Sequence, residues 1–264
     1  MDYDCNSGGE EIIVYGGRVH RKRKLRIIAI DGPVASGKTS IATVLSKKLH
    51  FVPIYTGVYY RFFSYLKAKV AEMNLRDFSY AHLKKGGLNI FPAEGTSSRD
   101  AFVKCLWNGE DITEKLFSLE ISRQTSQDSA NPETRKIVNG WIKKAVKECR
   151  GKGIVAEGRD CSTVLFPQAD LKIFLIASPE LRLRRSVEMV KKWAPGRSEE
   201  KLLWKEIREE MFQRDRRDTL RAFAPLTVPS GENALLLDTS FLSIEEVVEK
   251  ILDVWHTIRR QTPG

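Results

Sequence analysis

The residues best placed to do chemistry begin with an eight-residue segment, Gly32-Pro-Val-Ala-Ser-Gly37-Lys38-Thr39, that fits G-x-x-x-x-G-K-[ST]. Glycines at this spacing let the backbone wrap around phosphate oxygens and point its N–H groups at them. Lys38 is expected to reach the β- and γ-phosphates, and the Thr39 hydroxyl to ligate Mg²⁺. The segment therefore predicts a loop that binds a nucleoside triphosphate with Mg²⁺.

Three charged residues recur along a predicted helix near residue 220. Arg214, Asp218 and Arg221 are spaced i, i+4, i+7, so they share one helix face. An arginine grips phosphate oxygens through two parallel hydrogen bonds, and an aspartate accepts a hydrogen bond from a sugar hydroxyl. The spacing therefore favours a site for a phosphate that carries a sugar. The alternative is a solvated helix face whose charges only pair with one another.

A third group of charges, Glu157-Gly158-Arg159-Asp160, follows a predicted buried strand at 153–156. In open α/β sheets, ligands bind beyond the carboxyl ends of the strands. At this place Glu157 could hold a Mg²⁺-bound water, Arg159 could contact a phosphate, and Asp160 could accept a hydrogen bond from a base amine. A simple turn is the alternative for this tetrapeptide.

The elements that must position these residues follow from apolar runs that alternate with amphipathic stretches. This alternation predicts an α/β fold of the P-loop NTPase type, a parallel sheet flanked by helices on both faces. Strands are expected at 25–30, 51–54, 153–156, 171–176 and 234–237. Helices are expected directly after the glycine loop, at 61–75, over 117–150 with a break at Asn131-Pro132, over 180–220 with a break at 194–196, and after a capping box of Ser243 and Glu246.

Two stretches lie outside this alternation. Residues 76–116 are interpreted as an inserted lobe, with short strands at 88–91 and 101–107 and a tight-turn signal, NGED, at 108–111. Residues 1–24 are interpreted as an N-terminal extension, a solvated and partly ordered tail. Its basic run at 20–24 leaves a weak contact with nucleic acid as the alternative.

Length and composition limit the kinds of protein that this chain can be. A chain of 264 residues can form one α/β domain with an insertion and needs no disulfide to stabilise its core. The net charge of +10 fits nucleotide phosphates, nucleic acid or a plain basic surface. Four widely spaced cysteines form no CxxC pair, which favours a reduced, cytoplasmic protein. No apolar run approaches a membrane span, and the acidic N-terminus is unlike a signal peptide.

Together these segments resemble the bacterial-type cytidylate kinases, a family of nucleoside monophosphate kinases. The resemblance covers about residues 25–260, and its most specific parts are EGRD-x-x-TVLFP and RDxRDxxRAxAPL. The matching stretches are IAIDGPVASGKTSIA at 28–42, TGVYYR at 56–61, NGEDIT at 108–113, VAEGRDCSTVLFPQADLKIFLIASPELRLRR at 155–185, RDRRDTLRAFAPL at 214–226 and LLLDTSFLSIEEVVEKI at 235–251.

The resemblance implies transfer of the γ-phosphoryl group of ATP to CMP or dCMP, with Mg²⁺, in pyrimidine nucleotide metabolism. It implies a monomer without an obligate protein partner, with a kinase domain at 25–264, an NMP-binding lobe at about 76–150 and a helical, mobile LID at about 186–212. ATP would be bound by Gly32, Pro33, Val34, Ala35, Ser36, Gly37, Lys38, Thr39 and Ser40, with Arg184 or Arg185 approaching its phosphates.

The same resemblance assigns the acceptor site. It implies that Arg61, Arg159 and Arg214 hold the acceptor phosphate, and that Asp218 and Arg221 meet the sugar. The cytosine edge would be read by Ser126, Arg135 and Asp160. Lys38, Arg159, Arg214 and Arg221 would act catalytically on the moving phosphoryl group.

Three positions depart from the family pattern. Tyr55 stands where an aspartate usually precedes Thr-Gly, Phe117 stands where an arginine is usual, and Ser162 stands where GRD-x-GT has its glycine. Because Tyr55 and Phe117 are near the expected acceptor site, the acceptor is open between CMP and another small phosphate ester such as UMP. A nucleic-acid-binding or regulatory protein that has kept the fold is the third hypothesis.

Overall fold

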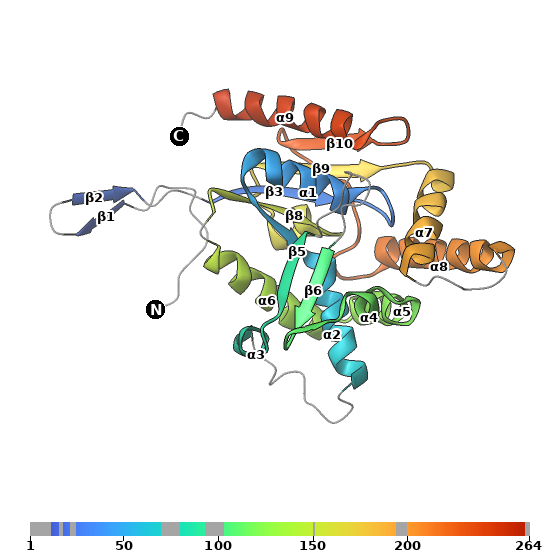
Figure 1. The fold of residues 1–264 in the computed structure, drawn as a ribbon. Helices are drawn as coiled ribbons and strands as arrows, with labels where there is room; N and C mark the ends of the chain where they lie inside the picture. The colour runs from blue at the N-terminus through green and yellow to red at the C-terminus, as the bar shows by residue number, and fades with distance from the viewer. Residues whose placement is uncertain are drawn as a thin grey trace.

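The computed structural model describes residues 12–15, 18–21, 25–69, 80–92, 103–149, 151–193 and 200–261. At its centre, five parallel strands form a sheet in the order β10-β9-β3-β8-β4 (Figure 1). Each strand lies within one residue of its predicted bounds. The strands are β3 (Arg26–Asp31), β4 (Val52–Tyr55), β8 (Gly153–Glu157), β9 (Leu171–Ile176) and β10 (Ala234–Asp238).

Helices α1 (Lys38–Leu49) and α9 (Ile244–Gln261) cover one face of this sheet. Apolar side chains of the strands meet the apolar stripes of both helices. Trp255 of α9 belongs to this core. The predicted capping box starts α9: the Ser243 N–H donates to the Glu246 carboxylate at 2.7 Å, and the Glu246 N–H donates to Ser243 Oγ at 3.2 Å.

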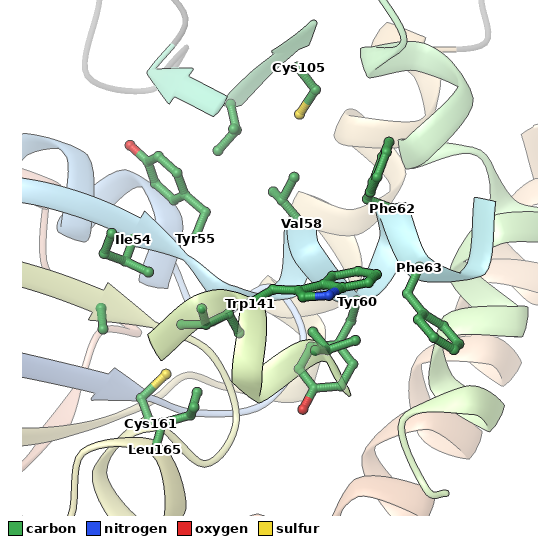
Figure 2. Close-up of a cluster of buried hydrophobic side chains, with 14 of the residues drawn as sticks. Ile54, Tyr55, Val58, Tyr60, Phe62, Phe63, Cys105, Trp141, Cys161 and Leu165 are labelled. Atoms are coloured by element: carbon green, nitrogen blue, oxygen red, sulfur yellow. The ribbon is translucent and has the colours of Figure 1, made fainter. Parts of the chain in front are cut away.

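Helices α2 (Thr56–Lys69) and α6 (Pro132–Glu148) pack on the opposite face. Figure 2 shows aromatic side chains from both helices gathered beside the strand ends. The expected break before α6 is confirmed, because the Asn131 side chain caps that helix. Helix α2 begins five residues before its predicted start, directly at the end of β4, where the Thr56 hydroxyl donates to the Glu157 carbonyl at 2.8 Å. Its predicted end at 75 lies outside the described residues.

The segment predicted as an inserted lobe contains a small antiparallel sheet, β5-β6-β7. The NGED turn is found between β6 and β7, with Asn108 and Gly109 both at positive φ. The elements are α3 (Tyr80–Lys85), β5 (Asn89–Pro92), β6 (Val103–Trp107), β7 (Glu110–Asp111), α4 (Thr113–Phe117) and α5 (Leu119–Asp128).

The charged helical pair consists of α7 (Pro179–Trp193) and α8 (Glu200–Leu220). Apolar side chains of the two helices form their own small core. The predicted breaker at 194–196 lies outside the described residues.

In the N-terminal extension, β1 (Ile12–Tyr15) and β2 (Arg18–Arg21) form an antiparallel hairpin that the sequence had suggested only as partial order. Within the described part of the chain, no helix is both long and apolar enough to cross a membrane.

Candidate active site

The predicted site residues meet at the carboxyl edge of the parallel sheet. Ile30 of β3 pairs with Glu157 of β8, so the chain segments that follow these two strands leave the sheet side by side. The glycine loop follows one strand, and Gly158-Arg159-Asp160 follows the other. Two motifs that are 125 residues apart in sequence therefore share one crevice, as expected for open α/β sheets.

Gly32 opens the glycine loop in a backbone conformation that requires glycine. Its φ is 151°, and a Cβ at this position would lie 2.2 Å from the Leu175 carbonyl oxygen and 2.9 Å from Ser36 Oγ. At the other end of the loop, Gly37 has φ 96° and starts α1 without any side-chain cap. The first turn of α1 therefore presents backbone N–H groups that no capping side chain occupies, as an anion site at a helix N-terminus needs.

Lys38 and Glu157 are buried together beneath this loop. The Lys38 ammonium donates to the Pro33 carbonyl at 2.6 Å and to Ser36 Oγ at 3.3 Å. Burial lowers the pKa of Lys38 to about 7, and the nearby Arg159 cation adds to this effect while Glu157 opposes it. Burial raises the pKa of Glu157. The Lys38 and Arg159 cations and a hydrogen bond from the Thr39 side chain partly offset this rise.

Thr39 and Glu157 fit a magnesium site by their chemistry. A hydroxyl and a carboxylate are hard oxygen donors, and Mg²⁺ in kinases is usually held by one or two protein groups together with the nucleotide's phosphates and water. Among the described residues there is no cluster of three His, Cys, Asp or Glu side chains that could hold a metal without such help.

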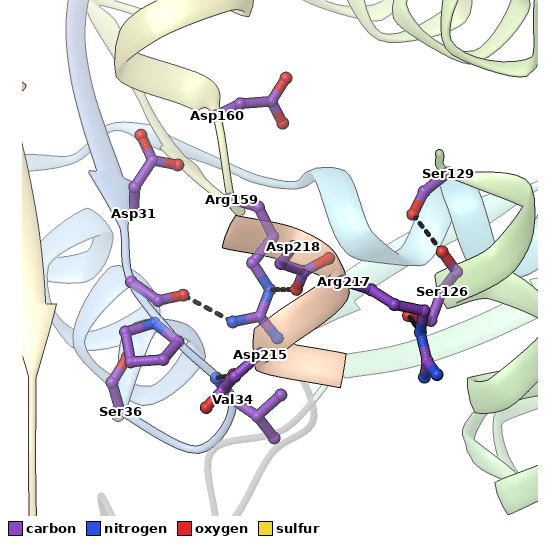
Figure 3. A network of polar contacts seen from close by, with 12 residues as sticks. Asp31, Val34, Ser36, Ser126, Ser129, Arg159, Asp160, Asp215, Arg217 and Asp218 are labelled. Carbon is purple, nitrogen blue, oxygen red and sulfur yellow. Dashed lines mark hydrogen bonds and ion pairs between the residues drawn. The ribbon is translucent and has the colours of Figure 1, made fainter. Parts of the chain in front are cut away.

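Three arginines, one after β8 and two on α7, donate hydrogen bonds to carbonyl groups of the glycine loop (Figure 3 shows Arg159 among them). Arg159 donates to the Gly32 carbonyl at 2.6 Å, Arg182 to that of Val34 at 3.2 Å, and Arg185 to that of Ala35 at 3.3 Å. Of the two arginines expected to approach the ATP phosphates, Arg185 therefore reaches the loop, whereas Arg184 is exposed on α7.

Asp215 and Arg182 also engage the loop, and the sequence did not single them out. Asp215 Oδ1 accepts a hydrogen bond from the Val34 N–H at 3.1 Å, and its other oxygen pairs with Arg182. Both residues lie within the stretches that resemble the cytidylate kinases. Asp215 is 181 residues from Val34 in sequence, and Arg182 is 148 residues from it. Only the packing of α7 and α8 against the loop brings them there.

Three arginines predicted to hold the acceptor phosphate interact with one another. Burial lowers the pKa of Arg61 to about 9 and that of Arg214 to about 10, and repulsion from the neighbouring guanidiniums contributes to both shifts. Arg159 belongs to the same group and pairs with Asp218, Nε to Oδ2, at 3.3 Å. Partly buried cations that repel one another favour an anion as their ligand.

The residues predicted for sugar and base form a buried ionic network. Arg135 pairs with Asp160, and the two side chains are 2% and 5% exposed. Arg221 lies between two carboxylates, 3.6 Å from Asp218 and 3.8 Å from Asp160. Arg214 Nε and Arg221 Nη2 are buried without a hydrogen-bond partner among the described residues, so the network has donors left for a polar ligand.

Ser126, the remaining predicted base-reading residue, is buried on α5 beside this network. Its hydroxyl accepts a hydrogen bond from Arg217 Nε of α8 at 2.9 Å (Figure 3). The structure therefore brings all eight predicted acceptor residues to one region, and adds Arg217 as the side chain that holds Ser126.

Asp31, at the end of β3, is a buried residue that the sequence did not single out. Its carboxylate accepts hydrogen bonds from the N–H groups of Cys161 and Ser162, at 2.8 and 2.7 Å, and from Ser162 Oγ at 2.5 Å. Burial raises the pKa of Asp31, and the Ser162 hydrogen bonds oppose that shift. Asp31 thus fixes the chain directly after Asp160, and Ser162, one of the departures from the family pattern, supplies two of the three donors.

Tyr55, another departure, lies at the end of β4 and is 1% exposed. Its hydroxyl hydrogen-bonds with Thr43 of α1 at 2.7 Å, and Thr43 donates to the Thr39 carbonyl at 2.8 Å. Burial raises the pKa of Tyr55 to about 12, so the phenol stays neutral. Through Thr43 the Tyr55 hydroxyl supports the first turns of α1, and it adds no charge to the site.

Comparison with known proteins gives one consistent result. A family model described as cytidylate kinase matches residues 28–257. A protein named cytidylate kinase from Fervidobacterium nodosum is 38% identical over 231 residues, which are 86% of this chain and 94% of that protein. Proteins of the same name from Carboxydothermus hydrogenoformans and Caldanaerobacter subterraneus are 37% and 36% identical, over 86% and 90% of this chain and 96% of each relative.

Proposed function

Because this chain belongs to the cytidylate kinase family, we propose that it transfers the γ-phosphoryl group of ATP to CMP or dCMP, giving ADP and CDP or dCDP. The observation that carries the proposal is Arg159, which donates to the Gly32 carbonyl on the donor side and pairs with Asp218 on the acceptor side. Arg159 thus belongs both to the proposed triphosphate site and to the proposed site for the acceptor's phosphate, sugar and base.

In this proposal the protein acts by placement and by charge. The loop from Gly32 to Ser40 and the N-terminus of α1 would hold the ATP phosphates, with Lys38 at the β- and γ-phosphates and Arg185 nearby. Lys38, Arg159, Arg214 and Arg221 would neutralise the charge on the moving phosphoryl group. Mg²⁺, held by Thr39 and by Glu157 through water, would supply further charge neutralisation at the phosphates when bound.

The acceptor would be recognised in three parts. Arg61, Arg159 and Arg214 would grip its phosphate, and Asp218 with Arg221 would meet its sugar. Asp160 would accept a hydrogen bond from the cytosine 4-amino group, with Arg135 and Ser126 completing the base edge. UMP carries an oxygen acceptor in place of that amine, so a buried carboxylate at this point should disfavour it.

Two of the three departures, Tyr55 and Phe117, bear on the phosphate side of the site more than on the base. Tyr55 supports α1, and the ring of Phe117 lies over Arg61. Asp160, Arg135 and Ser126 are all present in the buried network. This arrangement favours CMP over UMP as the acceptor.

Initial rates with CMP, dCMP, UMP and AMP, each with ATP and Mg²⁺, test the proposal. We expect CMP or dCMP to give the highest kcat/KM. A higher kcat/KM with UMP or AMP would refute the assignment of the acceptor, and salt-sensitive RNA binding without any turnover would favour a nucleic-acid-binding protein instead.

The same proposal includes a cytoplasmic monomer, in which the lobe at about 76–150 and a LID at about 186–212 close over the substrates. Three cysteines of the described chain, Cys105, Cys149 and Cys161, are free thiols, which suits a reducing compartment. The molar mass in solution, measured by light scattering, tests the monomer: a dimer's mass would contradict it.

A further inference from the structure

Phe117, the last residue of α4, places its ring against the guanidinium of Arg61. The Arg61 guanidinium carbon lies 4.8 Å from the ring centroid, within the range of a cation–π interaction. Phe117 stands where the family usually has an arginine, and Arg61 is one of the residues proposed to hold the acceptor phosphate. The replacement is therefore in direct contact with the proposed phosphate site.

Arg61 is fixed by two further contacts from the same lobe. Its Nη1 donates to the Leu116 carbonyl at 2.9 Å and to Ser122 Oγ at 2.8 Å. Both bonds use Nη1, so they do not consume the N–H groups on Nε and Nη2. The ring of Phe117 is a third contact with this guanidinium, and it lies 4.8 Å from the guanidinium carbon, so the cation is held by the ring as well as by the two hydrogen bonds.

The charge around Arg61 explains why a ring suits this position. Arg159 and Arg214 already repel the Arg61 cation, which is partly buried. An arginine at 117 would add another cation beside this group. An aromatic face instead carries partial negative charge and attracts a guanidinium without competing for the anion that the guanidinium is to bind.

We infer that Phe117 is a positioning residue for the acceptor phosphate, holding the Arg61 guanidinium in the orientation that grips it. This inference rests on the proposed function, because the anion is the 5′-phosphate of the acceptor nucleotide. The ring acts through Arg61 on the phosphate and has no part in reading the base.

The test compares Phe117→Leu, which keeps an apolar side chain but removes the ring, with Phe117→Tyr, which keeps the ring. Binding of CMP and of cytidine is measured by calorimetry, and KM and kcat are measured for CMP and ATP. A cation–π contact between partly buried groups corresponds to about a three- to tenfold change in affinity, between the values for exposed and for fully desolvated pairs. For Phe117→Leu we expect CMP binding to weaken by that factor, with cytidine binding, the KM for ATP and kcat within about twofold of wild type. Phe117→Tyr should behave as wild type.

Lys69→Met is the matched control. Lys69 lies over the ring of Tyr65 at 5.5 Å, on the same helix as Arg61, and its side chain is exposed. Loss of this second cation–π pair should leave CMP binding unchanged.

Two outcomes would overturn the inference. One is a Phe117→Leu variant that binds CMP as tightly as wild type. The other is a variant that binds CMP and cytidine equally weakly, which would show that the ring only supports the lobe. Because binding is measured without turnover, these results are separate from the proposed function, which fails if wild-type protein binds CMP but does not phosphorylate it.

Discussion

The backbone N–H of Val34, in the glycine loop, donates a hydrogen bond to the Asp215 carboxylate of α8, whose Oδ1 lies 3.1 Å away. Arg182 of α7 pairs with the same carboxylate and donates to the Val34 carbonyl. Both backbone groups of one loop residue are thus held by the helical pair, and the Val34 side chain packs on that pair's core. The conformation of the loop therefore depends on two helices that are remote from it in sequence.

Asp215→Asn should weaken the donor half of the site selectively. The amide keeps the shape of the side chain but loses the charge that binds Arg182, and charge-assisted hydrogen bonds contribute about 1.5–3 kcal/mol. We expect the KM for ATP to rise about tenfold, since 1.4 kcal/mol is a factor of ten, with the KM for CMP within about twofold. Glu209→Gln, an exposed change on the same helix, is the control and should alter neither constant. Equal effects on ATP and CMP would contradict this role for Asp215.

Binding of ATP should be accompanied by proton uptake by Lys38. Burial lowers the pKa of Lys38 to about 7, so above that pH the free protein holds it largely neutral, whereas phosphate oxygens favour the ammonium. Affinity for ATP should therefore be highest below about pH 7 and fall as the pH rises through that value. Calorimetry at pH 8 in two buffers of different ionisation enthalpy should show the uptake.

Lys38→Met provides the comparison, because a methionine cannot take up a proton. This variant should show no proton uptake by residue 38 and should lower kcat by orders of magnitude, since the charge at the β- and γ-phosphates is lost. Equal proton uptake in both proteins would show that another group titrates.

Asp218→Asn should weaken binding of the acceptor more than that of ATP. Asp218 pairs with both Arg159 and Arg221 and is 3% exposed, so the carboxylate orients two cations and would also accept a hydrogen bond from the sugar. We expect the KM for CMP to rise about tenfold or more, as for loss of a hydrogen bond to a charged group. If Asp218 contacts a sugar hydroxyl, removing the sugar hydroxyls of the acceptor should cost wild type more affinity than it costs the variant. An equal loss in both proteins would argue against the sugar contact.

Asp160→Asn should narrow the preference for CMP over UMP. An amide can donate as well as accept, so it can pair with the uracil oxygen that a carboxylate repels. The variant should also be less stable, because it leaves Arg135 buried without its counter-charge, and breaking such a pair costs about 3–5 kcal/mol. The kcat/KM ratio for the two nucleotides is the readout, taken below the variant's Tm.

Asp170→Asn separates these two effects. Asp170 pairs with Arg26 at the opposite edge of the sheet, where β3 begins. Asp170→Asn should lower the free energy of unfolding without changing the ratio of kcat/KM for CMP to kcat/KM for UMP. An unchanged ratio in Asp160→Asn itself would remove Asp160 from base recognition.

Ser162→Ala should lower the free energy of unfolding. The change removes one of three hydrogen bonds to the buried Asp31 carboxylate, which should cost about 1–3 kcal/mol. Urea denaturation of the ligand-free protein measures the effect. Thr257→Ala removes an exposed hydroxyl hydrogen bond to the Asp253 carbonyl and should cost no more than about 0.5 kcal/mol. Similar losses in both variants would mean that burial of Asp31 does not matter.

Local patterns predicted the parts of this structure that local physics determines. The strand before the loop, the glycines and the helix break at Asn131-Pro132 each depend on a few neighbouring residues, so their sequence signals are complete. The choice between Arg184 and Arg185 depended on the rotation of α7 about its axis, which no local signal fixes. Arg182, Asp215 and Asp31 were missed because their partners lie more than 120 residues away, and each residue alone reads as an ordinary charge.

The position of Arg159 would make the two nucleotides interdependent ligands. One guanidinium donates to the loop that would hold ATP and pairs with the carboxylate that would hold the acceptor's sugar, so a shift of Arg159 caused by either substrate would change the site of the other. Thermodynamic linkage then requires that each substrate change the affinity for its partner by the same factor. Affinity for CMP measured with and without a non-hydrolysable ATP analogue would give this factor directly.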